Sequence, residues 1–318
     1  MKYRTISFSF ALTLLLIVCP LHSEQQKSAD AHFQKGESFR LDNALDRALA
    51  SYRKAIEADK RHVRAHMAYQ DMMIRRMGKG DVIRGEYRKL QEAHPGDPVF
   101  RFLTARLVDE PVILKEEAED ILQMDQEFYW GYILLGKAFS GMDLDADALE
   151  AYKKAAALDP EEAQAYFEMA AIHQRLENLD EAGTLYKQAL QKDSSRVEIH
   201  AYLLGIDYKT SQDKEASKER IRVHIERLLD KYPKCPTFMY QLDRVCMPIF
   251  GNEYRIVFSD RLEELDSTGR IAQEIDFNLS ISAANQEEKI RRFKDFLKHY
   301  PDSELKNIAY SNLVNSLM

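Results

Sequence analysis

The sequence is poor in the residues that interrupt regular structure, with only 12 glycines and 9 prolines in 318 positions. Ala, Leu, Glu and Lys recur throughout instead, and these residues have high helix propensity. A protein built mainly of β-strands would need more turn residues than this chain supplies. The composition therefore predicts an all-α protein.

Cysteine is also scarce. Of the three cysteines, Cys19 lies near the N-terminus, which leaves Cys235 and Cys246 for the rest of the chain. If both lie along one helix, their positions are roughly 16 Å apart, which is beyond the roughly 7 Å between Cα atoms that a disulfide can span. We therefore expect two buried thiols and no disulfide scaffold.

Positive charge is in deficit, with 45 Lys and Arg against 52 Asp and Glu and a net charge of −7. An acidic surface repels the phosphate backbone of nucleic acids. We therefore expect no nucleic-acid partner.

Motifs that carry chemistry are missing as well. Gly78-Lys79-Gly80 lacks the spacing of a phosphate-binding loop and falls where a turn between helices is due. His62 and His66 could share a helix face as metal ligands, but His62 falls in a turn and no third ligand accompanies them. No Ser or Cys nucleophile has a recognisable base partner. The sequence therefore predicts no enzyme activity, no cofactor and no metal site.

Long apolar runs are absent except near the N-terminus. Lys2 and Arg4 precede a mostly apolar run from Ile6 to Val18, which is shorter than the roughly 20 residues that span a bilayer. This pattern is typical of a secretory signal peptide, and we predict cleavage after Ser23. The expected organisation is a signal peptide at 1–23, a short linker at 24–28 and a folded repeat domain at 29–318.

The same segment has a second interpretation. Leu16 to Cys19 resembles the cleavage motif of lipoproteins, which would place a lipid on Cys19, although a small residue is expected where Val18 stands. Pro20 is expected to end the apolar helix in either case. Both interpretations predict a secreted or periplasmic protein, attached to a membrane only through a lipid on Cys19.

The rest of the chain repeats itself with a period of about 34 residues. The slots that recur hold small residues where two helices cross closely, aromatic residues between helix pairs, and a proline that closes a unit. They are occupied by Gly36, Ala48 and Tyr52, by Gly136, Ala148, Tyr152 and Pro160, and by Ala182 and Tyr186. These slots resemble the signature of the tetratricopeptide repeat family, most clearly over 29–60, 129–162 and 163–196.

The resemblance implies a right-handed superhelical solenoid of antiparallel helix pairs. The closing position can be followed through Lys60, Pro95, Gln126, Pro160, Ser194, Pro233, Ser267 and Pro301. We therefore expect about eight units and one terminal helix, with the signature divergent over 197–318. Whether the natural chain continues past Met318 stays open.

Several departures from the repeat are expected. Asp109-Glu110-Pro111 interrupts a shortened third unit, and extra residues from Lys209 to Glu219 lengthen the sixth by a loop or a longer helix. Asp143 to Asp145 and Asn178 to Asp180 are expected turns, with an Asp that caps the next helix. The last helix, Glu304 to Met318, is expected to bury an apolar stripe and to expose a polar face. The stripe comprises Leu305, Ile308, Leu313, Val314 and Leu317.

The family resemblance also implies an inner groove lined by the first helix of each pair. Its slots carry over to Phe33, to Arg64 and Met67, to Trp130, Ile133 and Lys137, and to Phe167 and Gln174. Trp130, the only tryptophan, could anchor a bound peptide. The alternative is that Trp130 and Tyr129 pack against the irregular third unit. The Lys, Asn and Arg of a carboxylate clamp are not recognisable at these slots, so that specificity is not implied.

Together these features predict an exported scaffold that binds a protein or peptide partner in its groove without catalysis. Two alternatives stay open. The chain could be the helical N-terminal part of a longer exported enzyme or thioredoxin-like redox protein, or a lipoprotein component of an envelope assembly complex.

Overall fold

The structure, a computed structural model, describes residues 7–75, 79–251, 253–266, 270–281, 283, 285–303 and 305–317. Lys2 and Arg4 of the predicted signal peptide lie outside these residues, as do Gly78 of the rejected phosphate loop and the closing position Ser267. No helix of the described part is both long enough and apolar enough to cross a membrane.

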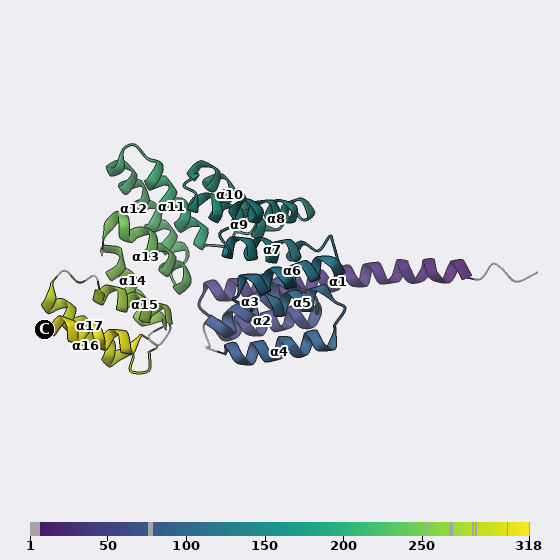
Figure 1. The fold of residues 1–318 in the computed structure, drawn as a ribbon, viewed down its shortest axis with the longest axis horizontal. Coiled ribbons are helices and arrows are strands. Elements are labelled where there is room, and N and C mark those ends of the chain that lie inside the picture. Colours follow the sequence, from purple (N-terminus) through teal and green to yellow (C-terminus); the bar gives the residue numbers. More distant parts are fainter. Residues whose placement is uncertain are drawn as a thin grey trace, which may run out of the picture. The chain divides into compact units, whose positions relative to one another are not determined.

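The described residues form helices and turns without strands, which confirms the predicted fold class (Figure 1). They divide into two compact units, with residues 41–43 and 109–318 in unit 2 and the rest in unit 1. Unit 1 holds α1 (Ser7–Leu41, except its last residue), α2 (Leu45–Ala58), α3 (Val63–Arg75), α4 (Gly80–Ala93) and α5 (Pro98–Ala105).

Unit 2 holds the remaining helices. These are α6 (Pro111–Met124), α7 (Tyr129–Gly141), α8 (Asp145–Leu158), α9 (Ala163–Arg175), α10 (Leu179–Lys192), α11 (Glu198–Thr210), α12 (Lys214–Lys231), α13 (Pro236–Phe250), α14 (Glu253–Asp266), α15 (Arg270–Ile281), α16 (Gln286–His299) and α17 (Lys306–Leu317). Each described closing position falls between two helix pairs, as predicted. The 17 helices of the described residues equal eight pairs and one extra helix.

The small slots of the repeat admit a tyrosine ring from the second helix of the same pair. A Cβ atom added to Gly36 would lie 2.4 Å from Cε1 of Tyr52, and one added to Gly136 would lie 2.4 Å from Cε1 of Tyr152. Both rings are buried, at 0% and 1% exposure. Ala48, Ala148 and Ala182 are fully buried as well. The repeat signature is therefore a packing constraint, because these glycines leave the space that the rings fill.

The turns within the pairs differ from the expected capping turns. Asp143 does not cap α8, because its backbone has a φ of +59°, and Asn43 and Glu177 have similar values at the matching positions. In each turn the next residue donates its N–H to a carbonyl five residues back, with 2.9 Å from Leu144 N to Phe139 O. This is the left-handed helix ending in which glycine is the favoured residue.

Glu177 should therefore cost stability in its present backbone conformation, since left-handed geometry costs a side-chain-bearing residue about 1–2 kcal/mol. We expect Glu177→Gly to raise the free energy of unfolding by about 0.5–1 kcal/mol relative to Glu177→Gln. Both variants lose the ion pair with Lys209 (2.9 Å), so the comparison isolates the backbone. Chemical denaturation of the two variants measures the difference, and equal stabilities would contradict the assignment of strain.

The N-terminal helix differs from its prediction. Helix α1 includes Pro20, where an end was expected, and residues 24–28, where a linker was expected. A proline removes one backbone hydrogen bond from a helix but leaves the others of the ladder in place. Residues 24–28 contain no glycine or proline, so nothing in them breaks the helix, and all five are exposed.

The irregular units follow their predictions. Helix α5 ends at Ala105 and α6 begins at Pro111, so the expected interruption separates the two helices of the third unit. The extra residues of the sixth unit lengthen a helix, since α12 has 18 residues. Cys235 immediately precedes α13 and Cys246 lies within it, and both thiols are free and buried, as predicted.

The terminal segment buries the predicted stripe only in part. Leu305 and Leu313 are half-buried and pack against the cluster that contains Phe293 and Phe296, as predicted. Ile308, Val314 and Leu317 are 52%, 53% and 60% exposed, whereas Ala309 and Ser316 are buried. Small side chains let α17 approach α16 closely, and the Gln286 Nε2 donates a hydrogen bond of 2.7 Å to the Ser316 carbonyl. The apolar pattern therefore predicts the packing of two stripe residues, whereas it is wrong for the other three.

A buried histidine lies in unit 1. His66 is 3% exposed, with Nε2 at 3.0 Å from the Lys60 carbonyl and Nδ1 at 2.7 Å from the Tyr87 hydroxyl. A carbonyl can only accept, so Nε2 donates to it and Nδ1 accepts from Tyr87 in the neutral ring. Burial lowers the pKa of His66, and the neighbouring His62 lowers it further.

This pKa predicts a stability that depends on pH. The unfolded chain binds the proton more readily than the folded one, so the contribution of His66 is complete above about pH 6.5 and is lost as the pH falls below it. We expect the wild type to lose up to about 1 kcal/mol more than His66→Gln between pH 7.5 and pH 5.5, because one pKa unit corresponds to about 1.4 kcal/mol. Denaturation followed by circular dichroism across this range measures both, and parallel curves would contradict the prediction.

Candidate functional site

A hollow of about 260 Å³ lies in unit 2, where α9, α10 and α11 provide its walls. We call it the α9–α11 hollow. Its lining residues are Phe167, Ala171, Gln174 and Arg175 from α9, Tyr186 from α10, and Tyr202 and Lys209 from α11. The four α9 residues follow a helical spacing that places them on one face. The two α11 residues are seven apart and likewise share a face.

Three aromatic rings form the floor of the hollow. Tyr186 and Tyr202 stack with ring centroids 5.2 Å apart and planes 10° apart. Phe167 lies 5.8 Å from Tyr186 and 6.1 Å from Tyr202. Tyr186 is buried, whereas Phe167 and Tyr202 are half-buried. An apolar group that entered the hollow would therefore contact the accessible parts of these two rings.

The edge of the hollow carries hydrogen-bond donors. The Gln174 Oε1 accepts a hydrogen bond of 2.9 Å from the Tyr186 hydroxyl, which fixes the orientation of the amide. Its Nε2 has no hydrogen-bond partner within the described part of the chain. Arg175 and Lys209 are the only charged residues that line the hollow. All three groups suit a ligand that brings acceptors.

Both cations of the edge also make ion pairs at the surface. Arg175 bonds to the Asp145 carboxylate and, at 3.1 Å, to the Ser140 hydroxyl. Lys209 lies 2.9 Å from the Glu177 carboxylate. The Arg175 and Lys209 side chains are 44% and 52% exposed, and such exposed pairs contribute only about 0–1 kcal/mol. The cations therefore remain available to a ligand.

A polar chain lies beside the floor. Arg196 places its guanidinium carbon 5.5 Å from the Phe167 ring centroid and donates to the Gln164 Oε1 at 2.6 Å. Gln164 in turn donates to Glu168 at 2.6 Å. Burial raises the pKa of the Glu168 carboxyl, although Gln164, Arg196 and Lys137 oppose the shift. This chain holds Arg196 over Phe167 and so fixes that ring.

Two segments of the sequence match family descriptions of the tetratricopeptide repeat, over residues 29–62 and 135–196. The second match includes the α9 and α10 walls of the hollow. Tetratricopeptide repeats are therefore found in these two segments. No curated protein matches the sequence.

Solved structures share the fold. One is a crystal structure of the APC/C hetero-tetramer Cut9-Hcn1, which is similar to this chain at 15% sequence identity with a TM-score of 0.57. The matched region covers 91% of this chain and 55% of the chain in that structure. Another is the human IFIT1 dimer with m7Gppp-AAAA, which has 14% sequence identity and a TM-score of 0.57. The matched region covers 81% of this chain and 62% of the IFIT1 chain. This chain therefore spans about half the length of the first of these proteins. At such identities the likeness establishes the fold alone.

The groove slots implied by the tetratricopeptide repeats divide into three groups in the structure. Phe167 and Gln174 lie at the α9–α11 hollow. Arg64 and Met67 are half-buried and Lys137 is exposed, and none of the three lines the α9–α11 hollow. Phe33, Trp130 and Ile133 are buried, at 5%, 9% and 6% exposure.

Trp130 therefore fits the packing alternative better than the anchoring one. Its ring makes an edge contact with Tyr129 at 5.0 Å between centroids. Gly131 of the same helix packs against Ile121 and Leu122 of α6, the second helix of the irregular third unit. Phe33 is covered by Tyr52, His62 and Arg64.

Sequence reasoning missed Arg175, Tyr202 and Lys209. Arg175 follows the groove slot Gln174 by one residue. The 34-residue period carries the slots Phe167 and Gln174 over to Ala201 and Tyr208 of α11, which Tyr202 and Lys209 each follow by one residue. Side chains of this length reach the hollow from neighbouring positions of the helix. Tyr186, predicted only as a packing residue, is also part of the floor. An aromatic residue next to a groove slot was the available signal.

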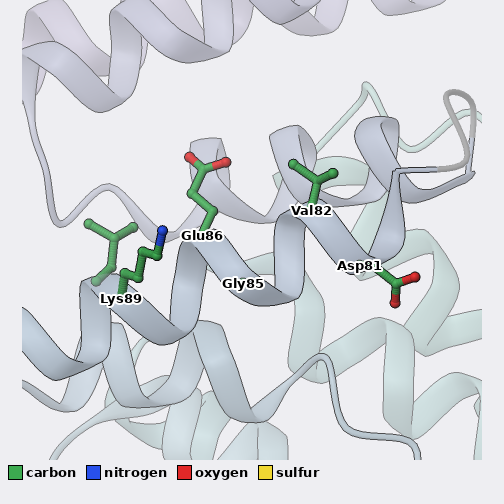
Figure 2. A pocket seen from close by; sticks show the side chains of 6 residues that line it. Asp81, Val82, Gly85, Glu86 and Lys89 are labelled. Atoms are coloured by element: carbon green, nitrogen blue, oxygen red, sulfur yellow. The ribbon is translucent and has the colours of Figure 1, made fainter.

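A larger hollow of about 520 Å³ lies against α4, but all of its lining residues belong to that one helix (Figure 2). Asp81, Val82, Glu86 and Lys89 are spread along an exposed face, and no second element brings groups toward them. Within the described residues no group of three or more His, Cys, Asp or Glu could hold a metal ion. The α9–α11 hollow is thus the better-formed site.

Proposed function

We propose that this chain is an exported, non-catalytic scaffold that binds an extended segment of a protein partner at the α9–α11 hollow. The observation that carries the proposal is that the accessible aromatic rings of Phe167 and Tyr202 lie in one hollow with the Gln174 Nε2, which has no hydrogen-bond partner among the described residues. Rings supply apolar contact area, and the amide can bond to a peptide carbonyl. Tetratricopeptide repeats act in general as protein-interaction scaffolds, which supports the same conclusion.

The rigidity of the walls supports binding. The three rings contact one another, and Gln174 and Arg196 are each held by a hydrogen bond. Groups that are already fixed lose little conformational entropy when a ligand arrives, so more of the contact energy appears as affinity. The volume of the hollow is below the roughly 300–1,000 Å³ of small-molecule sites, which favours one large side chain of a longer ligand.

Site-specific cross-linking tests this function. A photoreactive amino acid at Ala171, inside the hollow, should capture a partner in cells that produce the chain. The matched position is Lys187, which is exposed on α10 and does not line the hollow. We expect an adduct at Ala171 that is lost with Tyr202→Ala and absent at Lys187. Equal adducts at both positions would reject the hollow as the binding site.

Export is part of the proposal and rests on residues 1–23. The first buried residue of the described side chains is Ala29, with 24–28 all exposed, so removal of 1–23 takes no described core residue from the domain. We expect mass spectrometry of the protein from its native cells to find an N-terminus at Glu24. A lipid on Cys19 would instead indicate a membrane-anchored lipoprotein, and an intact N-terminus would reject export.

A further inference from the structure

The charges around the α9–α11 hollow indicate what kind of segment it binds. We propose that the partner segment presents one large apolar side chain with an aspartate or glutamate within two residues of it. This inference rests on the proposed function and adds the chemistry of the partner. The occupant is an internal segment of a protein, because the inference uses side chains and needs no chain terminus.

The apolar side chain follows from the floor. Phe167 and Tyr202 are half-buried and lie 6.1 Å apart between ring centroids, and the buried Tyr186 lies against both. The hollow, of about 260 Å³, has room for one large side chain. Such a side chain would displace water from the rings and bury its own apolar surface, which is the favourable step.

The acidic residue follows from the edge. Arg175 and Lys209 come from different helices, α9 and α11, and are the only charged groups that line the hollow. With the Gln174 Nε2 they form a set of donors, and the lining residues include no acidic side chain that could pair with them. A segment carrying Lys or Arg beside its apolar anchor would meet like charges, whereas one carrying Asp or Glu would meet complementary ones.

The acids beside the edge compete for the same cations. Asp145 holds Arg175, and Glu177 holds Lys209 at 2.9 Å. Both pairs are at the surface, so a carboxylate of the partner can share or replace them. Neutralising one of these acids should therefore strengthen the binding of an acidic segment, an effect that misfolding could not imitate.

Peptide selection tests the inference. A random nonapeptide library, displayed within a loop so that no terminus is free, is selected on the full chain and on Arg175→Glu/Lys209→Glu. We expect the wild type to enrich Phe, Tyr, Trp or Leu with Asp or Glu within two residues, and the charge-reversed variant to enrich the same anchors with Lys or Arg. Lys187→Glu, with an exposed change away from the hollow, should enrich the wild-type pattern.

Fluorescence anisotropy with one enriched, end-blocked peptide completes the test. Tyr202→Ala should weaken binding at least tenfold, whereas Glu177→Gln should strengthen it two- to fivefold. If Tyr202→Ala weakens binding but the two libraries enrich the same charges, the acidic partner is wrong and the proposed function stands. If no enriched peptide depends on Tyr202, the proposed function fails. A single-stranded RNA that binds tighter than the peptides and needs Tyr202 would overturn the peptide assignment.

Discussion

Gly136→Ala should destabilise unit 2 by about 1–3 kcal/mol, the cost of overpacking a well-packed core. The new methyl group would lie 2.4 Å from Cε1 of Tyr152, and that ring is 1% exposed with protein on every side. The cost appears in spite of helix propensity, which favours Ala over Gly by about 0.5–1 kcal/mol. The steric conflict therefore outweighs helix propensity, and the net change in the free energy of unfolding is a loss.

Gly183→Ala is the matched control, because it adds the same methyl group to a helix of the same unit. There the nearest atom would be Cγ2 of Ile206 at 3.7 Å, an ordinary contact. We expect this variant to gain about 0.5–1 kcal/mol from propensity alone. Trp130, the only tryptophan, lies on α7 with Gly136, so its fluorescence during denaturation reports this part of unit 2. A Gly136→Ala chain as stable as Gly183→Ala would refute the packing argument.

A second substitution extends the test. Tyr152→Leu removes the ring edge that the methyl group would strike. In that background Gly136→Ala should cost less than in the wild type, because contacting residues do not act additively. An unchanged cost would mean that the methyl group is resisted by something other than Tyr152.

Glu37→Leu should destabilise unit 1 by about 2–4 kcal/mol. Glu37 is 7% exposed. Its carboxylate accepts a hydrogen bond of 2.5 Å from the Tyr52 hydroxyl and forms an ion pair of 2.7 Å with Arg40. Leu would fill the space but leave the buried hydroxyl and the guanidinium without this acceptor. Leaving such groups unsatisfied costs more than the hydrogen bonds themselves contribute.

Three controls separate the causes. Tyr52→Phe removes one hydrogen bond and should cost about 1 kcal/mol in the wild type, but close to nothing in Glu37→Leu. Glu57→Leu changes an exposed residue of α2 and should stay within about 0.5 kcal/mol. Circular dichroism reports both units, whereas Trp130 fluorescence reports unit 2. If circular dichroism shows that Glu37→Leu lowers the free energy of unfolding by less than about 1 kcal/mol, a stabilising role for this carboxylate is refuted.

The order of the helices could be predicted from the sequence because each unit must satisfy the same packing rule. A glycine faces a tyrosine ring at Gly36 with Tyr52 and again at Gly136 with Tyr152. That requirement leaves a period in the sequence that survives even where other slots diverge. The backbone of the turns could not be predicted, since Glu177 has no tendency toward the left-handed conformation that its position imposes.

The site was predicted only in part, because the repeat gives the face on which a residue lies but not what covers it. Phe167 and Trp130 both occupy predicted groove slots, yet Trp130 is buried while Phe167 is half-buried. The difference comes from the neighbours: the contact with Tyr129 helps to cover Trp130. In α17 the same limit appears, since close packing at Ala309 and Ser316 leaves Ile308 exposed.

Tyr186 belongs both to the repeat core and to the floor of the hollow, and this double role limits how the protein can change. Substitutions at Tyr186 would alter recognition only at the expense of folding. Tyr202, Arg175 and Lys209 are more exposed, so they can vary at lower cost to stability. New specificities, whether by natural drift or by engineering, should therefore arise first at these three positions, while Tyr186 stays the same.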